Sequence, residues 1–312
     1  MSVIIAIDIG GTQLRVSIYS GDSTAPINVQ RAPTHGMEDG AYDRLTALID
    51  SVWPKEPVAA ISVAAPGPVD PKTGIVFSTP NIKEWANFPL AQKLNLRFGV
   101  PVYLNNDAKM AAVGEWRYGA GQGHHDVLYL TISTGIGGGV ILDDHLLLGQ
   151  RGLATEVGHV TVLQNGPVCS CGRHGHLEAV ASGTAIAKYV GEKIAEGRRS
   201  VLKSGATLTA RAVAEAAKQG DELSKEAFAR AGTFIGQATA GFLHIFNPSI
   251  VIFGGGVTRS GDLILDPIKE SMHRNIMDPS YLDGLKITVA ELGDEAGLLG
   301  SLNQVRTLLS KK

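Results

Sequence analysis

Residues 3–20 read VIIAIDIGGTQLRVSIYS, and this stretch decides the class of fold. Its β-branched residues predict one strand over 3–9 and a second over 14–20, joined by Gly10-Gly11-Thr12. A strand that returns directly as a strand predicts a hairpin, whereas a Rossmann or P-loop site passes from a strand into a helix. The chain therefore begins with a glycine-turn hairpin.

The glycine turn has two interpretations. It can be an ordinary hairpin turn, since glycine is common there. Alternatively, its backbone N–H groups and the Thr12 hydroxyl donate hydrogen bonds to a phosphate, and Asp8 holds a hydrated Mg²⁺ beside that phosphate. This stretch alone leaves both interpretations open.

The same pattern recurs in the middle of the chain. DVLYLTIS at 126–133 predicts a strand, Thr134-Gly-Ile-Gly-Gly-Gly at 134–139 a turn, and VILDDHLLL at 140–148 a return. A repeat of this kind indicates two related lobes, each presenting a glycine turn to a shared cleft. A third run, Gly254-Gly255-Gly256, follows the strand predicted at 249–255, and it either approaches a nucleotide or packs tightly.

Asp107 stands where a predicted strand at 100–106 meets a predicted helix at 108–117. A carboxylate at this junction can cap the helix. It can also act as a general base that accepts the proton of an attacking hydroxyl, with Asn106 orienting the same hydroxyl. Upstream, 58–70 predicts a buried strand that ends in Ala-Pro-Gly-Pro, and 73–85 predicts a hairpin with Asn81 in its polar loop.

Residues 156–178 read EVGHVTVLQNGPVCSCGRHGHLE and contain both cysteines of the chain. Cys169 and Cys171 hold Zn²⁺ only if two further ligands converge, and His159 and His176 supply them in a four-ligand set typical of structural zinc. His174 is a rival ligand. Chance thiols with surface histidines remain an equal alternative on composition alone.

The rest of the chain predicts strands, helices and one hinge. Thr207 is expected to start the helix at 207–218, and the glycines at 119–123 suggest the hinge. The remaining elements are a strand at 26–32, helices at 39–53, 88–98, 182–195, 221–247 and 262–274, a strand at 285–292, and a final helix at 295–310.

The composition is that of a globular protein, with 44% hydrophobic and 19% charged residues in 312. A net charge of −2 gives no broad field for nucleic acid or an anionic membrane, and no run approaches the ~20 apolar residues of a membrane-spanning helix. Two cysteines one residue apart are poorly placed to pair, and the start lacks the basic residues of a signal peptide. We expect a cytoplasmic protein with reduced thiols.

Taken together, the motifs resemble the ROK family of sugar kinases and repressors, over almost the whole chain. The glycine motifs are weak singly, but the ordered set is specific, above all Glu156-Val-Gly-His and Cys169-x-Cys-Gly-x-x-Gly. The other motifs are Asp8-Ile-Gly-Gly-Thr, Ala65-Pro-Gly-Pro, Thr79-Pro-Asn, Asn105-Asn-Asp-Ala and Thr134-Gly-Ile-Gly-Gly-Gly. Within the family, the resemblance is greatest to bacterial glucokinases.

The resemblance implies an α/β fold of the actin-like ATPase (ribonuclease H-like) type, with two lobes around a cleft. We expect lobes of residues 1–118 and 119–297, with a terminal helix of about 298–312 packing back on the first. It also implies transfer of the ATP γ-phosphoryl group to a sugar hydroxyl, most readily O6 of glucose, with Mg²⁺, in a homodimer that binds neither nucleic acid nor membrane.

The resemblance also assigns residues by position. Asp107 matches the catalytic base. The sugar-contacting positions are Gly67, Asn81, Asn106, Asp107, Glu156, His159 and Glu178. The nucleotide and Mg²⁺ positions are Asp8, Gly10, Gly11, Thr12, Gln13, Arg15, Thr134, Gly135, Gly255 and Gly256.

One departure concerns the zinc loop, because the family's last cysteine is replaced by His176. Imidazole is also a good zinc ligand, so we still expect structural zinc on His159, Cys169, Cys171 and His176. The rival functions are a ROK kinase for fructose, N-acetylmannosamine, N-acetylglucosamine or allose, a sugar-sensing repressor, and a zinc-dependent scaffold. Repressors of this family carry an additional N-terminal DNA-binding module, and a first motif that starts at residue 8 leaves no room for it, so we expect an enzyme. Polyphosphate is a rival phosphoryl donor.

Overall fold

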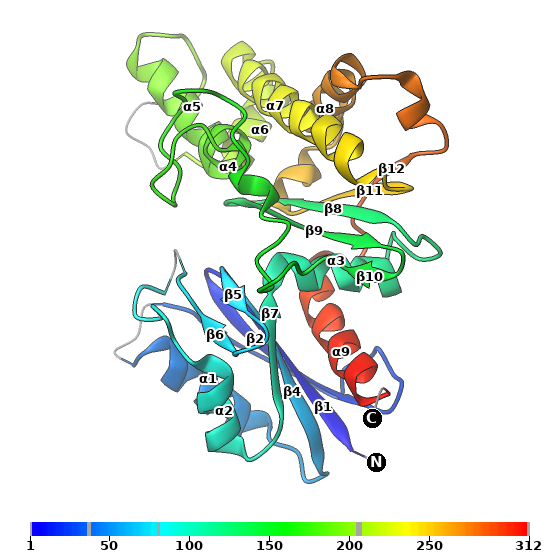
Figure 1. The fold of residues 1–312 in the computed structure, drawn as a ribbon. Coiled ribbons are helices and arrows are strands. Elements are labelled where there is room, and N and C mark those ends of the chain that lie inside the picture. The colour runs from blue at the N-terminus through cyan, green and yellow to red at the C-terminus, as the bar shows by residue number, and fades with distance from the viewer. Residues whose placement is uncertain (1, 36–38, 80–81, 204–207, 311–312) are drawn as a thin grey trace. The chain divides into compact units, whose positions relative to one another are not determined.

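The computed structural model describes residues 2–35, 39–79, 82–203 and 208–310. The chain divides into two compact units. The first contains residues 1–123, 145–155 and 291–312, and the second contains 124–144 and 156–290. Each unit is built on its own β-sheet, so we describe the two in turn (Figure 1).

The first unit has a five-stranded sheet in the order β3-β2-β1-β4-β7. Strands β1 and β2 form the antiparallel hairpin predicted from residues 3–20, and β4 and β7 continue the sheet in parallel with β1. The elements of this unit are β1 (Val3–Ile9), β2 (Gln13–Ser20), β3 (Asn28–Pro33), α1 (Ala41–Val52), β4 (Val58–Ala65), β5 (Val69–Asp70), β6 (Ile75–Val76), α2 (Leu90–Phe98), β7 (Val102–Asn106), α3 (Asp107–Tyr118), β10 (His145–Leu146), η4 (Gly293–Glu295) and α9 (Ala296–Leu309).

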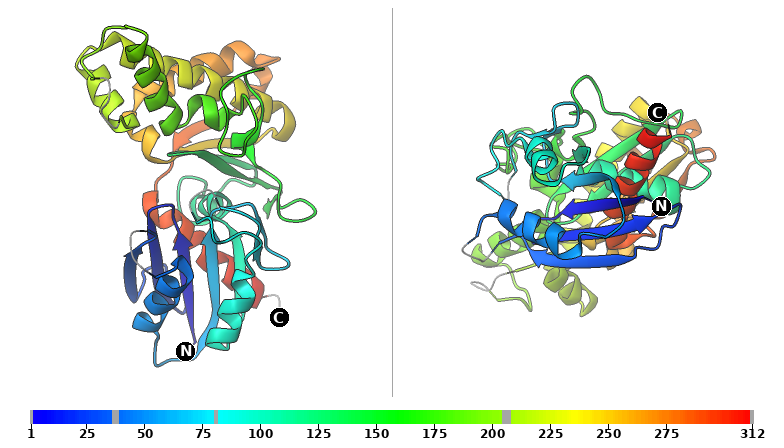
Figure 2. Two further views of the ribbon diagram at one scale, coloured as in Figure 1. Left: turned by 90° about the vertical axis from the view of Figure 1, so that its left-hand side faces the viewer. Right: turned by 90° about the horizontal axis from the view of Figure 1, so that it is seen from below.

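Helices cover both faces of this sheet, because alternate residues of its buried strands point to opposite sides. Ile5 and Ile7 of β1 belong to the core under α1 and α2, whereas Ile4 and Ala6 belong to the core under α9. Figures 1 and 2 show α1 and α2 on one face and α3 and α9 on the other. The unit is therefore a three-layer α/β sandwich.

Helices α3 and α9 cross with their backbones in contact. A Cβ atom on Gly114 of α3 would overlap the carbonyl oxygen of Ala296, and a Cβ on Gly300 of α9 would overlap that of Met110. Only glycine fits at these two points. This close crossing ties the C-terminal helix firmly to the helix that begins with Asp107.

The second unit repeats the strand order of the first, with β9-β8-β11-β12 corresponding to β2-β1-β4-β7. Strands β8 and β9 are antiparallel, while β11 lies parallel to both β8 and β12. The elements of this unit are β8 (Val127–Ile132), β9 (Ile136–Leu142), η1 (Val157–His159), α4 (Leu177–Ala181), α5 (Gly183–Ala195), α6 (Ala210–Lys218), α7 (Glu222–Phe246), β11 (Ile250–Gly254), η2 (Gly256–Ser260), α8 (Asp262–Asn275), η3 (Pro279–Leu282) and β12 (Lys286–Val289).

This repeated order of antiparallel and parallel strands is the actin-like ATPase fold, so the predicted fold class is confirmed. The hinge glycines at 119–123 end the first segment of the first unit, directly before the chain enters the second. In the sequence, the feature that indicated two related lobes is the repetition of a strand, a glycine turn and a strand.

Three local predictions were wrong. The hairpin expected over 73–85 does not have these bounds, because β6 pairs with the earlier β5 and its Val76 forms an antiparallel bridge with Phe88, beyond the expected range. The glycines at 137–139 lie in β9 rather than in a turn. Glycine is needed at 138 because a Cβ there would overlap the carbonyl oxygen of Tyr129 on the paired strand. Helix α6 begins with Thr209 as its cap, whose hydroxyl accepts the N–H of Ala212, so the helix expected from 207 starts later.

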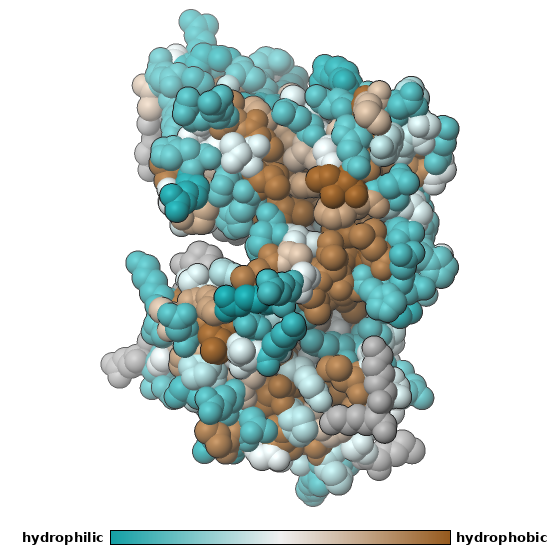
Figure 3. Space-filling model, in the orientation of Figure 1, coloured by the Kyte–Doolittle hydropathy of each residue, from teal (hydrophilic) through white to brown (hydrophobic). Residues whose placement is uncertain are grey.

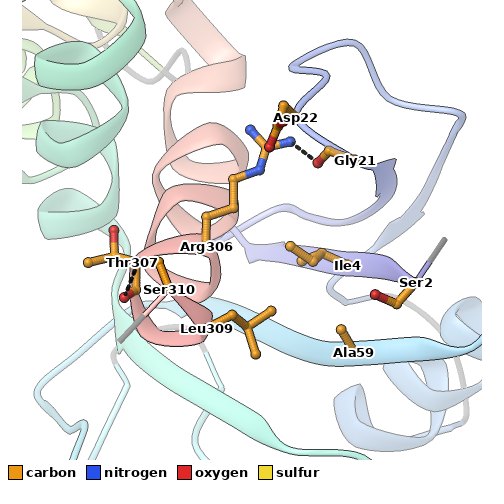
Figure 4. Close-up of a pocket in the computed structure, with 9 residues that line it drawn as sticks. All are labelled: Ser2, Ile4, Gly21, Asp22, Ala59, Arg306, Thr307, Leu309 and Ser310. Carbon is orange, nitrogen blue, oxygen red and sulfur yellow. Dashed lines mark hydrogen bonds between the residues drawn. The ribbon is translucent and has the colours of Figure 1, made fainter. Parts of the chain in front are cut away.

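The surface gives few direct pointers to function. Hydrophilic residues dominate the view in Figure 3, interrupted by smaller hydrophobic areas. Figure 4 shows residues that line a pocket in the first unit, between α9 and the amino end of β1, where Arg306 donates to the carbonyl oxygen of Gly21 at 2.8 Å. It contains no predicted site residue. Among the described helices, none has the length and apolar composition needed to cross a membrane.

Candidate functional site

Asp107 is the first residue of α3, directly after β7. The cap of this helix is Asn106, whose Oδ1 accepts the N–H of Lys109 at 3.1 Å, so the prediction that Asp107 itself could be the cap is wrong. Asp107 Oδ1 accepts the N–H of Ala108 at 2.8 Å. The carboxylate is thus fixed at the start of a helix.

The Ala-Pro-Gly-Pro loop lies beside Asn106. Strands β4 and β7 are parallel neighbours, with Ala65 opposite Asn106, so the loop after β4 and the start of α3 share one edge of the sheet. A Cβ on Gly67 would lie 3.0 Å from Asn106 Nδ2, too close for an unshifted contact. The structure therefore brings Gly67, Asn106 and Asp107 together. Asn81 lies outside the described residues.

Asp8 lies opposite Arg15 in the β1–β2 hairpin, and the two side chains form an ion pair. Burial raises the pKa of the Asp8 carboxyl above its ordinary value, and the Arg15 guanidinium opposes that shift. The first turn of α9 reaches the same carboxylate, since a Cβ on Gly297 would lie 3.4 Å from Asp8 Cγ. Asp8 is therefore a buried acid held by one cation.

Thr34, just beyond β3, fastens the glycine turn between β1 and β2. Its hydroxyl donates to the carbonyl oxygen of Gly10 at 2.8 Å, and its N–H donates to that of Thr12 at 3.0 Å. Gly10 N–H donates to the carbonyl oxygen of Gln13 at 2.9 Å, which closes the turn. Thr12 and Gln13 are exposed, so their side chains can meet a ligand from solvent.

In the second unit, the two remaining glycine turns follow neighbouring strands. β8 and β11 are parallel with Gly254 opposite Thr131, so Thr134-Gly135 and Gly255-Gly256 emerge at one edge of the sheet. A Cβ on Gly255 would overlap the carbonyl oxygen of Ile132, while Gly256 faces open space. Gly255 is thus required for packing and Gly256 leaves its backbone accessible.

Glu178 connects the Thr134-Gly135 turn to the cysteine loop. Its Oε2 accepts the N–H of Ile136 at 3.1 Å, and a Cβ on Gly135 would overlap that oxygen. Its Oε1 accepts the hydroxyl of Ser170 at 2.8 Å. The carboxylate is therefore positioned from both sides within this unit. Sequence reasoning missed Ser170, although its place between the two cysteines was a usable signal.

His159, Cys169, Cys171 and His176 form a cluster whose possible ligand atoms all lie within 4.8 Å of one another. The two Nδ1 atoms are 3.3 Å apart, Cys169 Sγ is 3.6 Å from His159 Nδ1, and Cys171 Sγ is 3.3 Å from His176 Nδ1. Tetrahedral zinc with ordinary bond lengths places two nitrogens about 3.3 Å apart and a sulfur and a nitrogen about 3.6 Å apart. These residues fit such an ion.

The protonation of this cluster also bears on metal binding. Burial raises the pKa of the Cys169 thiol and lowers that of the His176 imidazole. Without a metal, both side chains therefore favour the neutral form; a divalent cation reverses this for the thiol and uses the neutral imidazole directly. His174 bonds instead to the carbonyl oxygen of Gly166 at 3.1 Å and is outside the cluster.

Glu156 directly precedes η1, and its carbonyl oxygen accepts the N–H of His159 at 3.0 Å. The residue before it, Thr155, has a φ of 63°, in the left-handed region that β-branched residues avoid. Thr155 Oγ1 is buried and has no hydrogen-bond partner. Backbone strain of this kind gathers at functional positions.

Sequence reasoning also missed two buried charged residues of α3, Lys109 and Glu115. Lys109 follows the cap Asn106 by three residues and is 1% exposed. Nothing in the local pattern distinguishes such a lysine from a solvent-facing one.

Comparison with known proteins defines the class of the chain. The model of the ROK family matches residues 4–307, and the chain belongs to this family. A glucokinase of Thermotoga maritima is 37% identical over 310 residues, which are 97% of each chain.

Two solved structures are similar along most of the chain. One is a ROK family glucokinase from Streptomyces griseus in complex with glucose and AMPPNP, with 33% identity, a TM-score of 0.83 and coverage of 98% of this chain and 100% of that one. The other is a ROK family transcriptional regulator, a homologue of the Escherichia coli Mlc protein, with 25% identity, a TM-score of 0.84 and coverage of 96% of this chain and 76% of that one.

Proposed function

We propose that the protein is an ATP-dependent glucokinase that transfers the γ-phosphoryl group of ATP to the 6-hydroxyl of glucose. The observation that carries the proposal is a helix-starting carboxylate, Asp107, in a chain that matches a glucokinase over 97% of both chains at 37% identity. A carboxylate in this place can accept the proton of the attacking hydroxyl.

The sugar is assigned to a set of polar side chains. Asn106 and the backbone of Gly67 lie next to Asp107, so they can orient the hydroxyl that Asp107 deprotonates. Glu178 and His159 are both held in place by neighbours, which limits the conformational entropy they lose when they bind hydroxyls. Glu156 and Asn81 complete the proposed set from the sequence.

The nucleotide is assigned to the glycine turns. The exposed Thr12 hydroxyl and the backbone N–H groups around Gly10 and Gly11 are suitable donors for phosphate oxygens, with Arg15 as the nearby cation. Thr134, Gly135, Gly255 and Gly256 offer the same in the second unit. A Mg²⁺ ion bound with ATP would neutralise phosphoryl charge, and Asp8 is the residue of this chain that would hold its hydration shell.

We also propose that the Cys/His cluster holds structural zinc. Four protein ligands would complete a tetrahedron around the ion and leave no position for a substrate, which is the arrangement of structural rather than catalytic sites. With Nδ1 of His159 turned to the cluster, Nε2 is the nitrogen left to meet the sugar. The ion would thereby fix His159 and the loop that precedes Glu178.

A coupled assay of ADP release across glucose, fructose, allose, N-acetylglucosamine and N-acetylmannosamine tests the proposal. We expect activity with glucose far above that with the other sugars. The N-acetyl sugars are included because the name of one similar structure is that of an N-acetylmannosamine kinase. A preference for one of them would overturn the assignment of glucose as the substrate. Sugar binding without ADP release would favour a regulator, in line with the structural similarity to one.

Two further features are proposed with the activity. We expect ATP rather than polyphosphate to be the donor, which the same assay checks by exchanging one for the other. We expect a homodimer, to be measured as the molar mass by light scattering; a mass of one chain, 32.8 kDa, would exclude it.

A further inference from the structure

Glu115 is a fully buried carboxylate in α3 that none of the roles above uses. Its Oε2 accepts the N–H of Ala120 at 3.1 Å and the N–H of Glu291 at 3.1 Å, and its Oε1 accepts the N–H of Leu292 at 2.8 Å. A buried charge is costly unless it is hydrogen-bonded, and these three donors compensate it.

The three donors lie in two segments of the first unit, one before and one after the second unit in sequence. Ala120 lies just before the point where the chain leaves the first unit, after Gly123, and Glu291 is the residue at which it returns. The N–H of Glu291 comes from a residue 176 positions away from Glu115. One carboxylate therefore holds the first and the last of the four connections between the units.

The first connection is held by the main chain as well. The carbonyl oxygen of Glu115 accepts the N–H of Gly119 at 3.1 Å and of Gly121 at 2.9 Å. A Cβ on Gly119 would overlap Glu115 Oε2 and would lie 3.0 Å from Leu292 Cγ. Glycine at 119 is thus required for the carboxylate to reach both connections.

Glu115 shares its helix with Asp107, eight residues earlier. At 1.5 Å per residue the two lie about 12 Å apart along one rigid element. The close crossing with α9 at Gly114 and Gly300 fixes that element to the rest of the first unit, and Figure 1 shows α9 running across from α3. The same helix therefore carries the proposed base at one end and the anchor of two connections at the other.

We propose that Glu115 is a positioning residue of the kinase reaction. By clamping both connections to α3, it fixes, within the first unit, the points at which the chain leaves that unit and returns to it. The clamp itself follows from the hydrogen bonds, whereas its effect on turnover rests on the proposed function.

The first test measures the clamp directly by hydrogen–deuterium exchange. In Glu115→Gln, the amides at 119–121 and 291–292 should exchange about tenfold faster or more, because the amide group that replaces one oxygen cannot accept an N–H. Amides of α1 and β11 should be unchanged. Unchanged exchange at 119–121 and 291–292 would overturn the clamp, whether or not the protein phosphorylates sugar.

The second test asks whether the clamp matters for the reaction. In Glu115→Gln we expect kcat/KM for glucose to fall about tenfold or more, through kcat and KM together, because a small misplacement of a catalytic group is costly. Gly119→Ala, which displaces the carboxylate and keeps its charge, should reproduce the loss. It also serves as the test if Glu115→Gln does not fold.

Asp221→Asn is the matched control, because Asp221 is another buried carboxylate that accepts two backbone N–H groups, from Ser224 and Val201. It should lower stability and leave kcat and KM unchanged. Faster exchange at the two connections with wild-type kcat and KM would reduce Glu115 to a structural role and overturn the proposal. Absence of any sugar kinase activity in the wild type would instead refute the proposed function, with the exchange result unaffected.

Discussion

At the scale of single residues, Asp107 offers the sharpest test of the chemistry. Asp107→Asn keeps the shape of the side chain and its hydrogen bond with the N–H of Ala108, but removes the group that accepts a proton. We expect kcat to fall by a factor of about 10²–10⁴, the usual contribution of a general base, with a change of about threefold or less in the sugar KM. Steady-state kinetics with ADP detection measure both.

Asp262→Asn is the control for this substitution, because Asp262 is also the first residue of a helix, α8. It should leave kcat unchanged. If Asp107→Asn turns over within about threefold of the wild type, Asp107 is not the base.

Thr155 is the residue whose backbone is most at odds with its side chain. Thr155→Gly removes a β-branched residue from a φ of 63° and a buried hydroxyl with no partner, against a smaller entropic cost in the unfolded chain. We expect a gain of about 1–2 kcal/mol, seen as a Tm about 2–4 °C higher.

Asn165→Gly is the comparison, since Asn165 has a φ of 57° and asparagine tolerates that region. It should change Tm by less than about 1 °C. A Thr155→Gly variant no more stable than the wild type would mean that the surrounding structure already compensates the strain.

At the scale of elements, the stability of helix α7 depends on its N-cap residue, Asp221. Burial acts to raise the pKa of Asp221, but hydrogen bonds from the side chain of Ser200 and the N–H groups of Ser224 and Val201 hold it below its ordinary value of 3.8. A carboxyl whose folded pKa is lowered stabilises the fold above its unfolded pKa, and that contribution is lost as pH falls through the folded pKa.

Asp221→Asn should therefore cost about 1 kcal/mol at pH 7, since asparagine still caps the helix but lacks the charge. The difference from wild type should shrink as pH falls below 3.8. Urea unfolding at pH 7 and pH 3 measures it, with the exposed Glu222→Gln in the same helix as control. A deficit that does not depend on pH would show that charge is not its cause.

Long elements were predictable from the sequence because their apolar period extends over many residues. The helix predicted over 221–247 is observed as α7, with bounds that differ by one residue at each end. The hairpin expected over 73–85 failed because β5 and β6 have two residues each, too few to display a period. The glycines of β9 were predicted to form a turn because glycine is typical of turns. The reason for glycine in this strand is close packing of Gly138 against Tyr129 and Val157, which only the tertiary structure shows.

At the scale of the whole molecule, the same contrast holds for the site. The residues of the Cys/His cluster lie within 18 positions of sequence, so the sequence offered them as one possible ligand set, the family resemblance favoured it, and the structure brings the four side chains together. Glu115 could not be foreseen, because two of its three donors lie more than 170 positions away. A site whose residues are close in sequence could be predicted, whereas a hydrogen bond between residues far apart in sequence could not.

Zinc removal separates the stability of one segment from that of the two units. The loop at 156–178 contributes few residues to the buried core, so we expect the metal to provide much of its order. One zinc per chain should be found by elemental analysis. Chelation should abolish sugar binding and leave far-UV circular dichroism largely intact, because the sheets and long helices lie outside the loop.

Two variants identify the histidine ligand. His176→Ala should lose the metal, because Nδ1 of His176 lies 3.3 Å from both His159 Nδ1 and Cys171 Sγ. His174→Ala should retain it, because His174 bonds to the carbonyl oxygen of Gly166 instead. Loss of zinc in His174→Ala with retention in His176→Ala would reverse the assignment. Purified protein that is free of zinc, folded and fully active would refute the structural metal altogether.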